Sequence, residues 1–332
     1  MQTNTYKYMK QRLSWIDSAR GLAIVCVYIY HTGYNTPYHQ VFDYFLIPIF
    51  FFISGYLMNE RKNIKQALVG LTKRMIIPYF LLGLIIGLKP SYYASGGGIY
   101  CIIHSIMQVL SGRELWFVAC LIVIHLFAVF ANYFLSRQDA KVHTCLKFII
   151  IIISMCFIFS SVMEKHGDTS FYRIWQWRNA LNGIGYFYLG NLYRHNQDLF
   201  KVSNKQRIAI WASYIVVSLF CSFVLGSHID FASANFVNKP VSIGLSFFSI
   251  IAVVSFCKTI KSTVLQSLGR DTLFLFAINI WCIKLFNIIL SYISLNLLPE
   301  YIYGLLLASL AIMVADYINK FVRRFFPWLI GE

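Results

Sequence analysis

Apolar and polar residues follow each other along this chain in long blocks, and not in the alternation that is typical of half-buried β-strands. A helix needs about 20 mostly apolar residues to cross a bilayer core of roughly 30 Å. Ten blocks approach this length: 15–34, 41–58, 75–88, 114–135, 148–163, 179–193, 208–225, 241–257, 272–290 and 301–319. The pattern predicts an all-α, polytopic integral membrane protein with about ten transmembrane helices.

A further apolar run, 99–110, is too short to cross a bilayer and follows three glycines, Gly96 to Gly98. We interpret it as a re-entrant or interfacial segment. Every loop is short, so we expect a single transmembrane domain over residues 1–332. The first apolar run has no cleavage site of small residues, and we expect the protein to keep it as its first span.

The composition agrees with a membrane protein. Hydrophobic residues make up 58% of the chain and charged residues 13%, whereas soluble domains usually carry about 25% charged residues. This balance argues against a water-soluble enzyme. The eight cysteines are scattered, with no Cys-x-x-Cys motif and no Cys/His ligand spacing. We therefore expect neither disulfides nor a metal site.

The net charge of +16 is distributed as a membrane topology would require. If the N-terminus is cytoplasmic, the inside segments carry 21 of the 29 Lys and Arg residues and the outside segments carry 6. Cytoplasmic loops of membrane proteins are enriched in these residues. We expect both termini inside, in a multi-pass protein of the cell (plasma) membrane with lipid around it. A nucleic-acid partner is disfavoured, because the basic residues are divided among many short loops.

The first predicted span carries three ionisable side chains. Arg20 and His31 are eleven residues apart, which is close to three helical turns, so both face the same side, about 16 Å apart along the axis. Asp17 precedes Arg20 by three residues, a spacing that permits an ion pair. His31 can act as a general base and Arg20 can bind an anion or a carbonyl oxygen. Simpler alternatives stay open: Arg20 as an interfacial anchor, a local ion pair, and a His31 without a role at the outer interface.

Polar residues near the next spans are weaker candidates. Ser54, followed by Gly55, can bind a polar group or form a small-residue packing notch. A basic loop ends at Lys73-Arg74 and can hold an anionic cofactor or anionic lipid, or set the topology.

Two more candidates lie at the predicted start of the fourth span. Glu114 can pair with Arg113 or help to bind a polar acceptor, and Trp116 is by default an interfacial anchor.

Four short motifs occur in a fixed order in the first 120 residues: Ile16-Asp17-Ser18-Ala19-Arg20-Gly21 running to His31; Phe51-Phe52-Ile53-Ser54-Gly55-Tyr56-Leu57; Lys73-Arg74 followed by Pro78-Tyr79; and Leu115-Trp116-Phe117. Together with ten spans, this ordered set resembles acyltransferase family 3 of membrane proteins. One position departs from the family pattern. Members often have an Arg-x-x-Arg pair in the first cytoplasmic loop, and here Arg74 matches the second arginine while Leu71 stands in place of the first.

The resemblance implies transfer of an acyl group, usually acetyl from cytoplasmic acetyl-CoA, to a hydroxyl of a cell-surface glycan or its lipid-linked precursor. It implies that His31 is the general base and that Arg20, with Asp17, belongs to the catalytic set. Substrate-binding or donor-binding roles follow for Ser54, Tyr56, Lys73, Arg74, Glu114 and Trp116.

Other function classes compete with this interpretation. A transporter or flippase of lipid-linked saccharide also uses about ten spans and intramembrane charges, although the chain has no visible inverted repeat. A membrane-bound sensor or scaffold is a further alternative, and such a protein would catalyse no reaction. The acceptor sugar, the length of the acyl chain and the oligomeric state, with a homodimer as one alternative, stay open.

Overall fold

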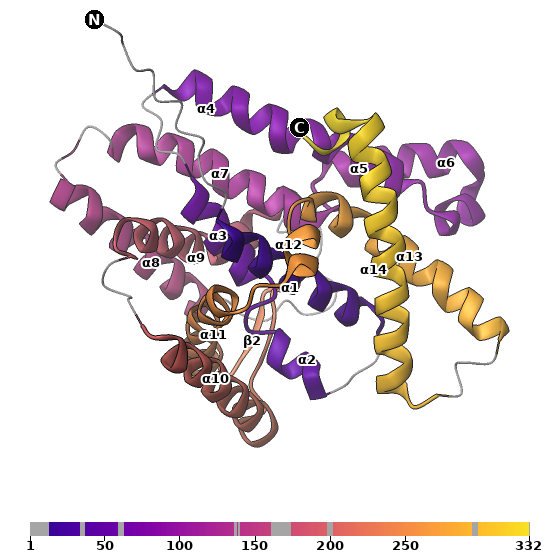
Figure 1. Ribbon diagram of the computed structural model, residues 1–332. Coiled ribbons are helices and arrows are strands. Elements are labelled where there is room, and N and C mark those ends of the chain that lie inside the picture. Colours follow the sequence, from indigo (N-terminus) through magenta and orange to yellow (C-terminus); the bar gives the residue numbers. More distant parts are fainter. Residues whose placement is uncertain are drawn as a thin grey trace, which may run out of the picture.

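The computed structural model describes residues 13–33, 37–58, 63–135, 138, 140–160, 174–197, 202–293 and 298–331. Almost all of them are helical (Figure 1). The helices are α1 (Ser14–His31), α2 (Pro37–Phe42), α3 (Pro48–Leu57), α4 (Ile64–Leu71), α5 (Ile77–Gly87), α6 (Pro90–Leu110), α7 (Trp116–Leu135), α8 (Ala140–Ser160), α9 (Trp177–His195), α10 (Asn204–Leu225), α11 (Lys239–Thr259), α12 (Thr263–Leu268), α13 (Thr272–Tyr292) and α14 (Glu300–Phe325).

Short elements join or extend these helices. A π-helical turn, η1 (Thr72–Ile76), connects α4 to α5, and two 3₁₀ turns, η2 (Ile174–Gln176) and η5 (Pro327–Ile330), precede α9 and follow α14. The strands β1 (His228–Asp230) and β2 (Asn235–Val237) form an antiparallel hairpin between α10 and α11.

The described residues contain seven helical stretches long and apolar enough to cross a membrane: Ile64–Gly87, which joins α4, η1 and α5, Trp116–Phe134, Lys141–Phe159, Asn204–Leu225, Lys239–Thr259, Thr272–Tyr292 and Glu300–Phe325. The prediction of an all-α, multi-pass membrane protein is therefore confirmed. The number of ten spans and the cytoplasmic position of both termini stay predictions.

The other three predicted spans coincide with α1, α3 and α9, which lie in the interior of the bundle (Figure 1). Twelve of the eighteen residues of α1 are buried, and its neighbours are α3, α11, α12, α13 and α14. A helix that is surrounded by protein can carry polar side chains, because it does not face hydrocarbon. This explains how α1 can carry buried Asp17 and Ser18 and α9 can carry buried Asn179, Asn182 and Asn191.

The crossing of α3 and α9 brings two backbones into direct contact. A Cβ atom on Gly55 would overlap the carbonyl of Phe187, and a Cβ atom on Gly190 would overlap the carbonyl of Phe52. Small residues allow this close approach of helices in membranes. Gly55 therefore provides the packing notch that its sequence context predicts.

The β hairpin folds back into the bundle. Phe231, at its tip, is buried and its ring centroid lies 5.4 Å from that of Phe51 on α3. The amide of Asn179 on α9 donates a hydrogen bond of 3.1 Å to the carbonyl of Ala232. The hairpin thus fixes α3 and α9 from the side on which α10 ends and α11 begins.

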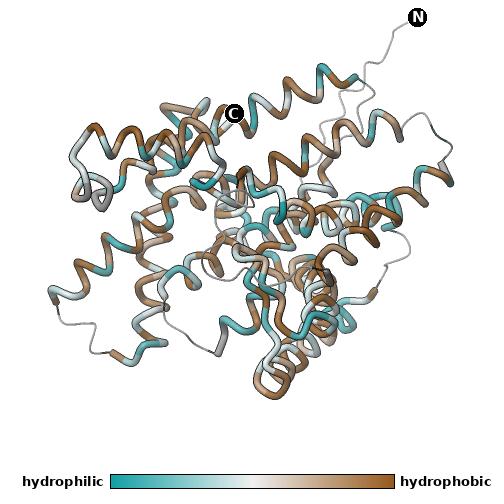
Figure 2. Tube along the Cα trace, turned by 180° about the vertical axis from the view of Figure 1, so that it is seen from behind, coloured by the Kyte–Doolittle hydropathy of each residue, from teal (hydrophilic) through white to brown (hydrophobic). Residues whose placement is uncertain are grey.

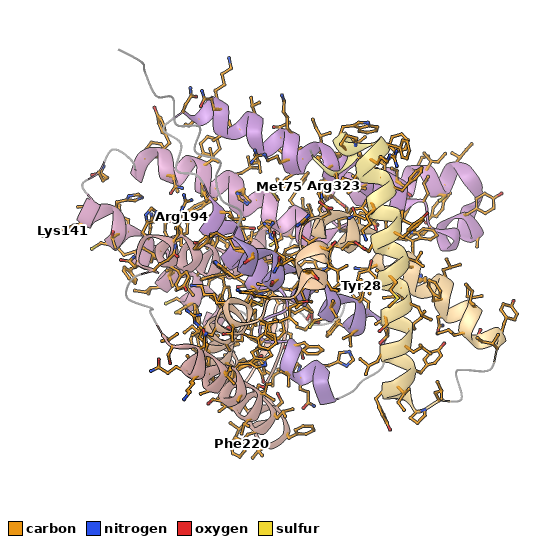
Figure 3. All side chains as sticks on the ribbon, viewed as in Figure 1. Tyr28, Met75, Lys141, Arg194, Phe220 and Arg323 are labelled. Carbon is orange, nitrogen blue, oxygen red and sulfur yellow. The ribbon has the colours of Figure 1, made fainter. Side chains whose placement is uncertain are left out.

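Hydrophobic residues run along most of the helices (Figure 2), and many large apolar side chains are exposed. Phe220 on α10 is 57% exposed and points away from the bundle, whereas Tyr28 on α1 is fully buried (Figure 3). Exposed apolar side chains in a membrane protein face the lipid. The short run 99–110 belongs to α6, which lies against α5 and is broken at Gly97, where the backbone φ angle is +80°. Its interpretation as a re-entrant or interfacial segment stays a prediction.

Candidate functional site

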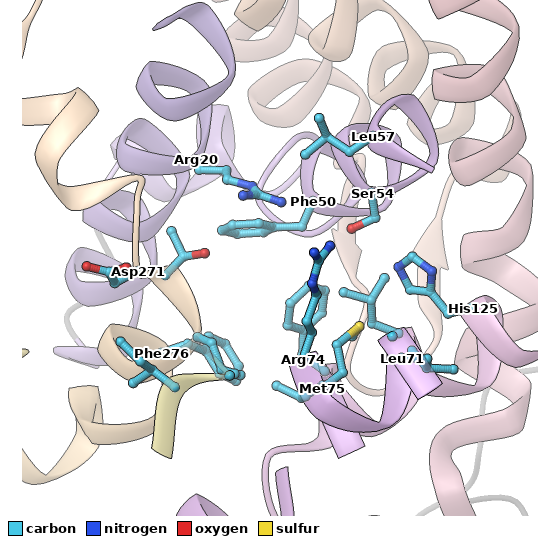
Figure 4. A pocket seen from close by; sticks show the side chains of 18 of the residues that line it. Arg20, Phe50, Ser54, Leu57, Leu71, Arg74, Met75, His125, Asp271 and Phe276 are labelled. Atoms are coloured by element: carbon cyan, nitrogen blue, oxygen red, sulfur yellow. The ribbon is translucent and has the colours of Figure 1, made fainter. Parts of the chain in front are cut away.

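A cavity of about 500 Å³ lies between α1, α3, α4, η1, α7 and the first turns of α13. Ile330 and Gly331, which follow α14, complete its lining. Cavities of this size hold ligands as large as common cofactors. Figure 4 shows the side chains around it.

Three arginines from separate parts of the chain line this cavity. Arg20 comes from α1, Arg74 from η1 and Arg270 from the turn between α12 and α13. The guanidinium groups of Arg20 and Arg74 point into the same space (Figure 4). Arginine presents a planar fork of N–H donors that binds phosphate and carboxylate groups. The cavity is therefore suited to an anionic ligand.

The carboxylate of Asp271, which also lines the cavity, is engaged by other residues. Its Oδ2 atom accepts hydrogen bonds of 3.1 Å from both Asn319 and Arg323 on α14. Because Arg323 balances this charge, Asp271 does not cancel the positive potential of the three arginines.

The position of Arg74 depends on the π-helical turn. The sequence predicts a loop here, but Lys73 and Arg74 lie within helical backbone. A π-helical turn inserts one extra residue and so changes which side chains face inward. Both residues are exposed, but Arg74 lines the cavity and Lys73 does not. Gly331 packs on the backbone of Arg74 in a left-handed conformation, with φ +80°, so the segment after α14 is seated directly against this turn.

Two further polar side chains face the cavity. Ser54 on α3 is buried, and its hydroxyl points toward the space between Arg20 and Arg74 (Figure 4). His125 on α7 also lines the cavity, and its ring lies edge-on to Phe187, with 5.2 Å between ring centroids. The sequence analysis gave His125 no role, although an ionisable residue in a predicted span is itself a signal of function.

His31 is held by an amide on a neighbouring helix. Its Nδ1 atom lies 3.0 Å from Oδ1 of Asn279 on α13, while the Asn279 amide nitrogen donates to the carbonyl of Phe276 at 2.9 Å. Because Asn279 presents its oxygen to the ring, Nδ1 of a neutral His31 carries the proton. The basic lone pair is then on Nε2, which is the arrangement that a general base requires.

His31 lies beyond one end of the cavity and does not line it. The cavity extends along α3 from Phe50 to Met58 and along α13 from Arg270 to Phe276. Tyr28 on α1 donates to the carbonyl of Leu275, and one turn later His31 pairs with Asn279. The two helices therefore run in the same direction. His31 therefore lies beyond the end of the cavity at which Phe276 is found. Arg270 is at the opposite end.

The far side of His31 carries aromatic and imidazole rings. The ring of Tyr30 lies edge-on to His31 and to His39, with centroid distances of 6.1 Å and 5.4 Å. His39 also lies 3.3 Å from the carbonyl of Ile29 through Nε2. This side has polar groups that can meet a hydroxylated molecule.

Other predicted site residues lie outside the cavity. Asp17 is buried on α1. Tyr56 on α3 is also buried; its hydroxyl accepts a hydrogen bond of 2.8 Å from Gln197, and its ring packs edge-on to Trp15 at 5.1 Å. Neither side chain lines the cavity.

Glu114 and Trp116 are also separate from the cavity. Glu114 forms a salt bridge of 2.8 Å with Lys89, which lies immediately before α6. Trp116 begins α7 and packs edge-on to Phe117. Of the nine predicted site residues, the structure thus brings Arg20, Ser54 and Arg74 together, places His31 beyond the cavity, and gives the others positions away from it.

Among the residues that the structure describes, no three His, Cys, Asp or Glu side chains are grouped so that they could hold a metal ion.

Comparison with known proteins gives one result. The model of a family described as acyltransferase domain, acyltransferase family 3, matches residues 13–318. Searches of curated protein sequences and of solved structures find no match to this chain. The family match covers every residue that lines the cavity except Ile330 and Gly331. Arg323 also lies outside the matched range.

Proposed function

This chain belongs to acyltransferase family 3, and we propose that it is an O-acetyltransferase of the cell membrane. In this proposal, a short acyl group moves from cytoplasmic acetyl-CoA to a hydroxyl of a cell-surface glycan or of its lipid-linked precursor. Membrane acyltransferase activity follows from the family. The donor, the acceptor and the roles of individual residues are the parts that we add.

The cavity is the proposed donor site. Coenzyme A carries several phosphate groups, and the guanidinium groups of Arg74 and Arg270 can bind them as charge-assisted pairs. Arg20, beside the ring of Phe50 (Figure 4), would position the donor. Asp17, three residues before Arg20, would help to position its helix turn.

His31 is the proposed general base. A hydroxyl is a weak nucleophile until a base removes its proton. Nε2 of His31 would take that proton as the hydroxyl oxygen attacks the thioester carbon. The carbon–sulfur bond then breaks, and the proton passes from His31 to the leaving thiolate. Asn279 would stabilise the imidazolium through the hydrogen bond that it accepts from Nδ1.

One observation carries this proposal: α1 holds Arg20 in the donor cavity and, three turns later on the same face, His31 in the orientation of a base. A single rigid helix therefore connects the proposed donor site with the proposed site of proton transfer. Tyr30 and His39, beyond His31, would contact the acceptor.

The test is acyl transfer by the full-length protein in proteoliposomes supplied with radiolabelled acetyl-CoA and an extract of surface glycans. We expect His31→Ala to reduce the rate by about 100-fold or more, as loss of a general base usually does. The variant should still bind acetyl-CoA, because His31 does not line the cavity. A folded His31→Ala protein with the wild-type rate would exclude this residue as the base. Translocation of saccharide without acetyl-CoA would instead support a transporter.

A further inference from the structure

Three phenylalanines line the cavity toward the end that faces His31. Phe50 comes from α3, Phe117 from α7 and Phe276 from α13, and all three line the cavity. Their rings are in contact: the centroids of Phe50 and Phe117 are 5.3 Å apart, and those of Phe117 and Phe276 are 5.4 Å apart. We call these three residues the phenylalanine group.

The phenylalanine group lies between the arginines and the histidine. Phe276 precedes Asn279 by three residues on α13, and its carbonyl accepts the hydrogen bond that fixes the Asn279 amide. The partner of His31 is therefore one helical turn beyond Phe276. A thioester that enters from the Arg74 and Arg270 end has to bring its carbonyl carbon past Phe276 before an oxygen activated by His31 can reach it.

The three rings differ in how firmly they are held. Phe117 packs against Phe51 as well, at 5.5 Å, and Phe51 in turn packs on Phe231 of the hairpin. Phe50 and Phe117 are both buried, at 6% exposure, whereas Phe276 is only partly buried. Phe276 is thus the ring with room to turn, and Phe50 and Phe117 form the fixed part of the constriction.

We infer that the phenylalanine group is a constriction that restricts transfer to short acyl chains, with Phe276 as the residue that sets the limit. This inference rests on the proposed function, because it concerns the acyl group that the enzyme moves. An acetyl group adds one methyl beyond the carbonyl and needs a small displacement of one ring. A longer chain needs space that the packed rings of Phe50 and Phe117 do not give, because well-packed interiors resist added volume.

The chemistry of the step is the same for every chain length. The acceptor oxygen forms a bond to the acyl carbon, the carbon–sulfur bond breaks, and the acceptor proton reaches the thiolate through His31. The donor arginines bind the coenzyme part, which all acyl-CoA substrates share. Chain length therefore affects only the passage of the acyl group, and the ratio of rates between donors isolates the effect of the constriction.

The experiment measures kcat/KM of the full-length protein in proteoliposomes with acetyl-, propionyl-, butyryl- and hexanoyl-CoA. For the wild type we expect a steep fall from acetyl to hexanoyl, since one methylene changes selectivity by about tenfold or more. In Phe276→Ala, the ratio of the hexanoyl to the acetyl rate should rise at least about tenfold. The matched control is Phe286→Ala, which removes a partly buried ring from the same helix outside the cavity. Its ratio should equal that of the wild type.

A second variant tests the opposite direction. Phe276→Trp places a larger ring in the constriction, so the rate of acetyl transfer at saturating acetyl-CoA should fall. If Phe276→Ala does not fold, Phe276→Leu replaces it, with a smaller expected rise in the ratio. A wild type that transfers hexanoyl as fast as acetyl, or Phe276 variants with the wild-type ratio, would overturn the inference. A wild type that transfers no acyl group from any donor would overturn the proposed function instead.

Discussion

At the scale of single residues, the proposed donor cavity depends on which basic side chains reach it. The segments predicted to be cytoplasmic are rich in Lys and Arg, yet among the residues described only Arg20, Arg74 and Arg270 of these side chains line the cavity. Lys73 has the same charge as its neighbour Arg74 but does not line the cavity. Arg270 is therefore, with Arg20 and Arg74, one of three guanidinium groups at the proposed donor site, and Leu71, which stands in place of the family's usual first arginine, lines the same cavity.

Arg270→Ala should weaken the binding of acetyl-CoA, the proposed acyl donor. A hydrogen bond to a charged group contributes about 1.5–3 kcal/mol, which corresponds to a rise in KM for acetyl-CoA of roughly 10- to 100-fold. The control is Lys261→Ala, an exposed basic residue of the neighbouring turn that does not line the cavity. In the Lys261→Ala variant, KM for acetyl-CoA should stay unchanged. If Lys73→Ala raises KM more than Arg270→Ala does, Lys73 is the residue that replaces the missing arginine.

At the scale of elements, the crossing of α3 and α9 fixes the site. Ser54 and Phe50, which face the cavity, are on the same helix as Gly55, which meets α9. The close approach of the two backbones therefore determines how far these side chains reach into the cavity. A residue without a polar group, such as Gly190, has in this way a direct effect on the geometry of the site.

Gly190→Ala should destabilise the protein, because its Cβ atom would overlap the Phe52 carbonyl and separate α3 from α9. Overpacking of this kind costs about 1–3 kcal/mol. Thermal unfolding in detergent, followed by tryptophan fluorescence, measures the loss. Gly244→Ala on α11 is the matched control, since a Cβ atom there meets no other atom within 4 Å. It should be neutral or slightly stabilising; equal losses in both variants would contradict this account of the crossing.

At the scale of the whole molecule, apolar helices surround more polar ones. The seven stretches with the length and apolarity of a span include α7, α8, α10, α11, α13 and α14, while α1, α3 and α9 are interior. Lipid cannot satisfy polar groups, so the outer helices face it with apolar side chains, while the interior helices α1 and α3 hold Arg20 and Ser54 at the cavity. The distribution of Lys and Arg predicts the orientation of this arrangement in the membrane.

The predicted orientation determines which end of α10 can be reached by a reagent from outside the cell. Lys205, near its start, should be cytoplasmic, and His228, which follows its end, should be outside. Lys205→Cys and His228→Cys are labelled in intact cells with a membrane-impermeant maleimide, with the wild type as the background for the native cysteines. Only His228→Cys should react before the cells are permeabilised. The reverse pattern would show that the topology is inverted.

Much of this protein could be predicted from its sequence, because bilayer thickness and hydrocarbon solvation act on each apolar segment separately. Block length indicates helices that cross a membrane, and the ordered motifs indicate the acyltransferase family. Arg20, His31, Ser54 and Arg74 could be singled out in the same way, since charge or position in a motif makes each one conspicuous.

Only the tertiary structure decided which of these residues meet. It placed Arg270 and His125 in the cavity beside Arg20, and it left Tyr56, Lys73, Glu114 and Trp116 outside. It also put Asn279 beside His31, 248 residues away along the chain, and the phenylalanine group between His31 and the arginines. The physical reason is that such contacts depend on how helices distant in sequence pack against one another, which the hydropathy of a single segment does not specify.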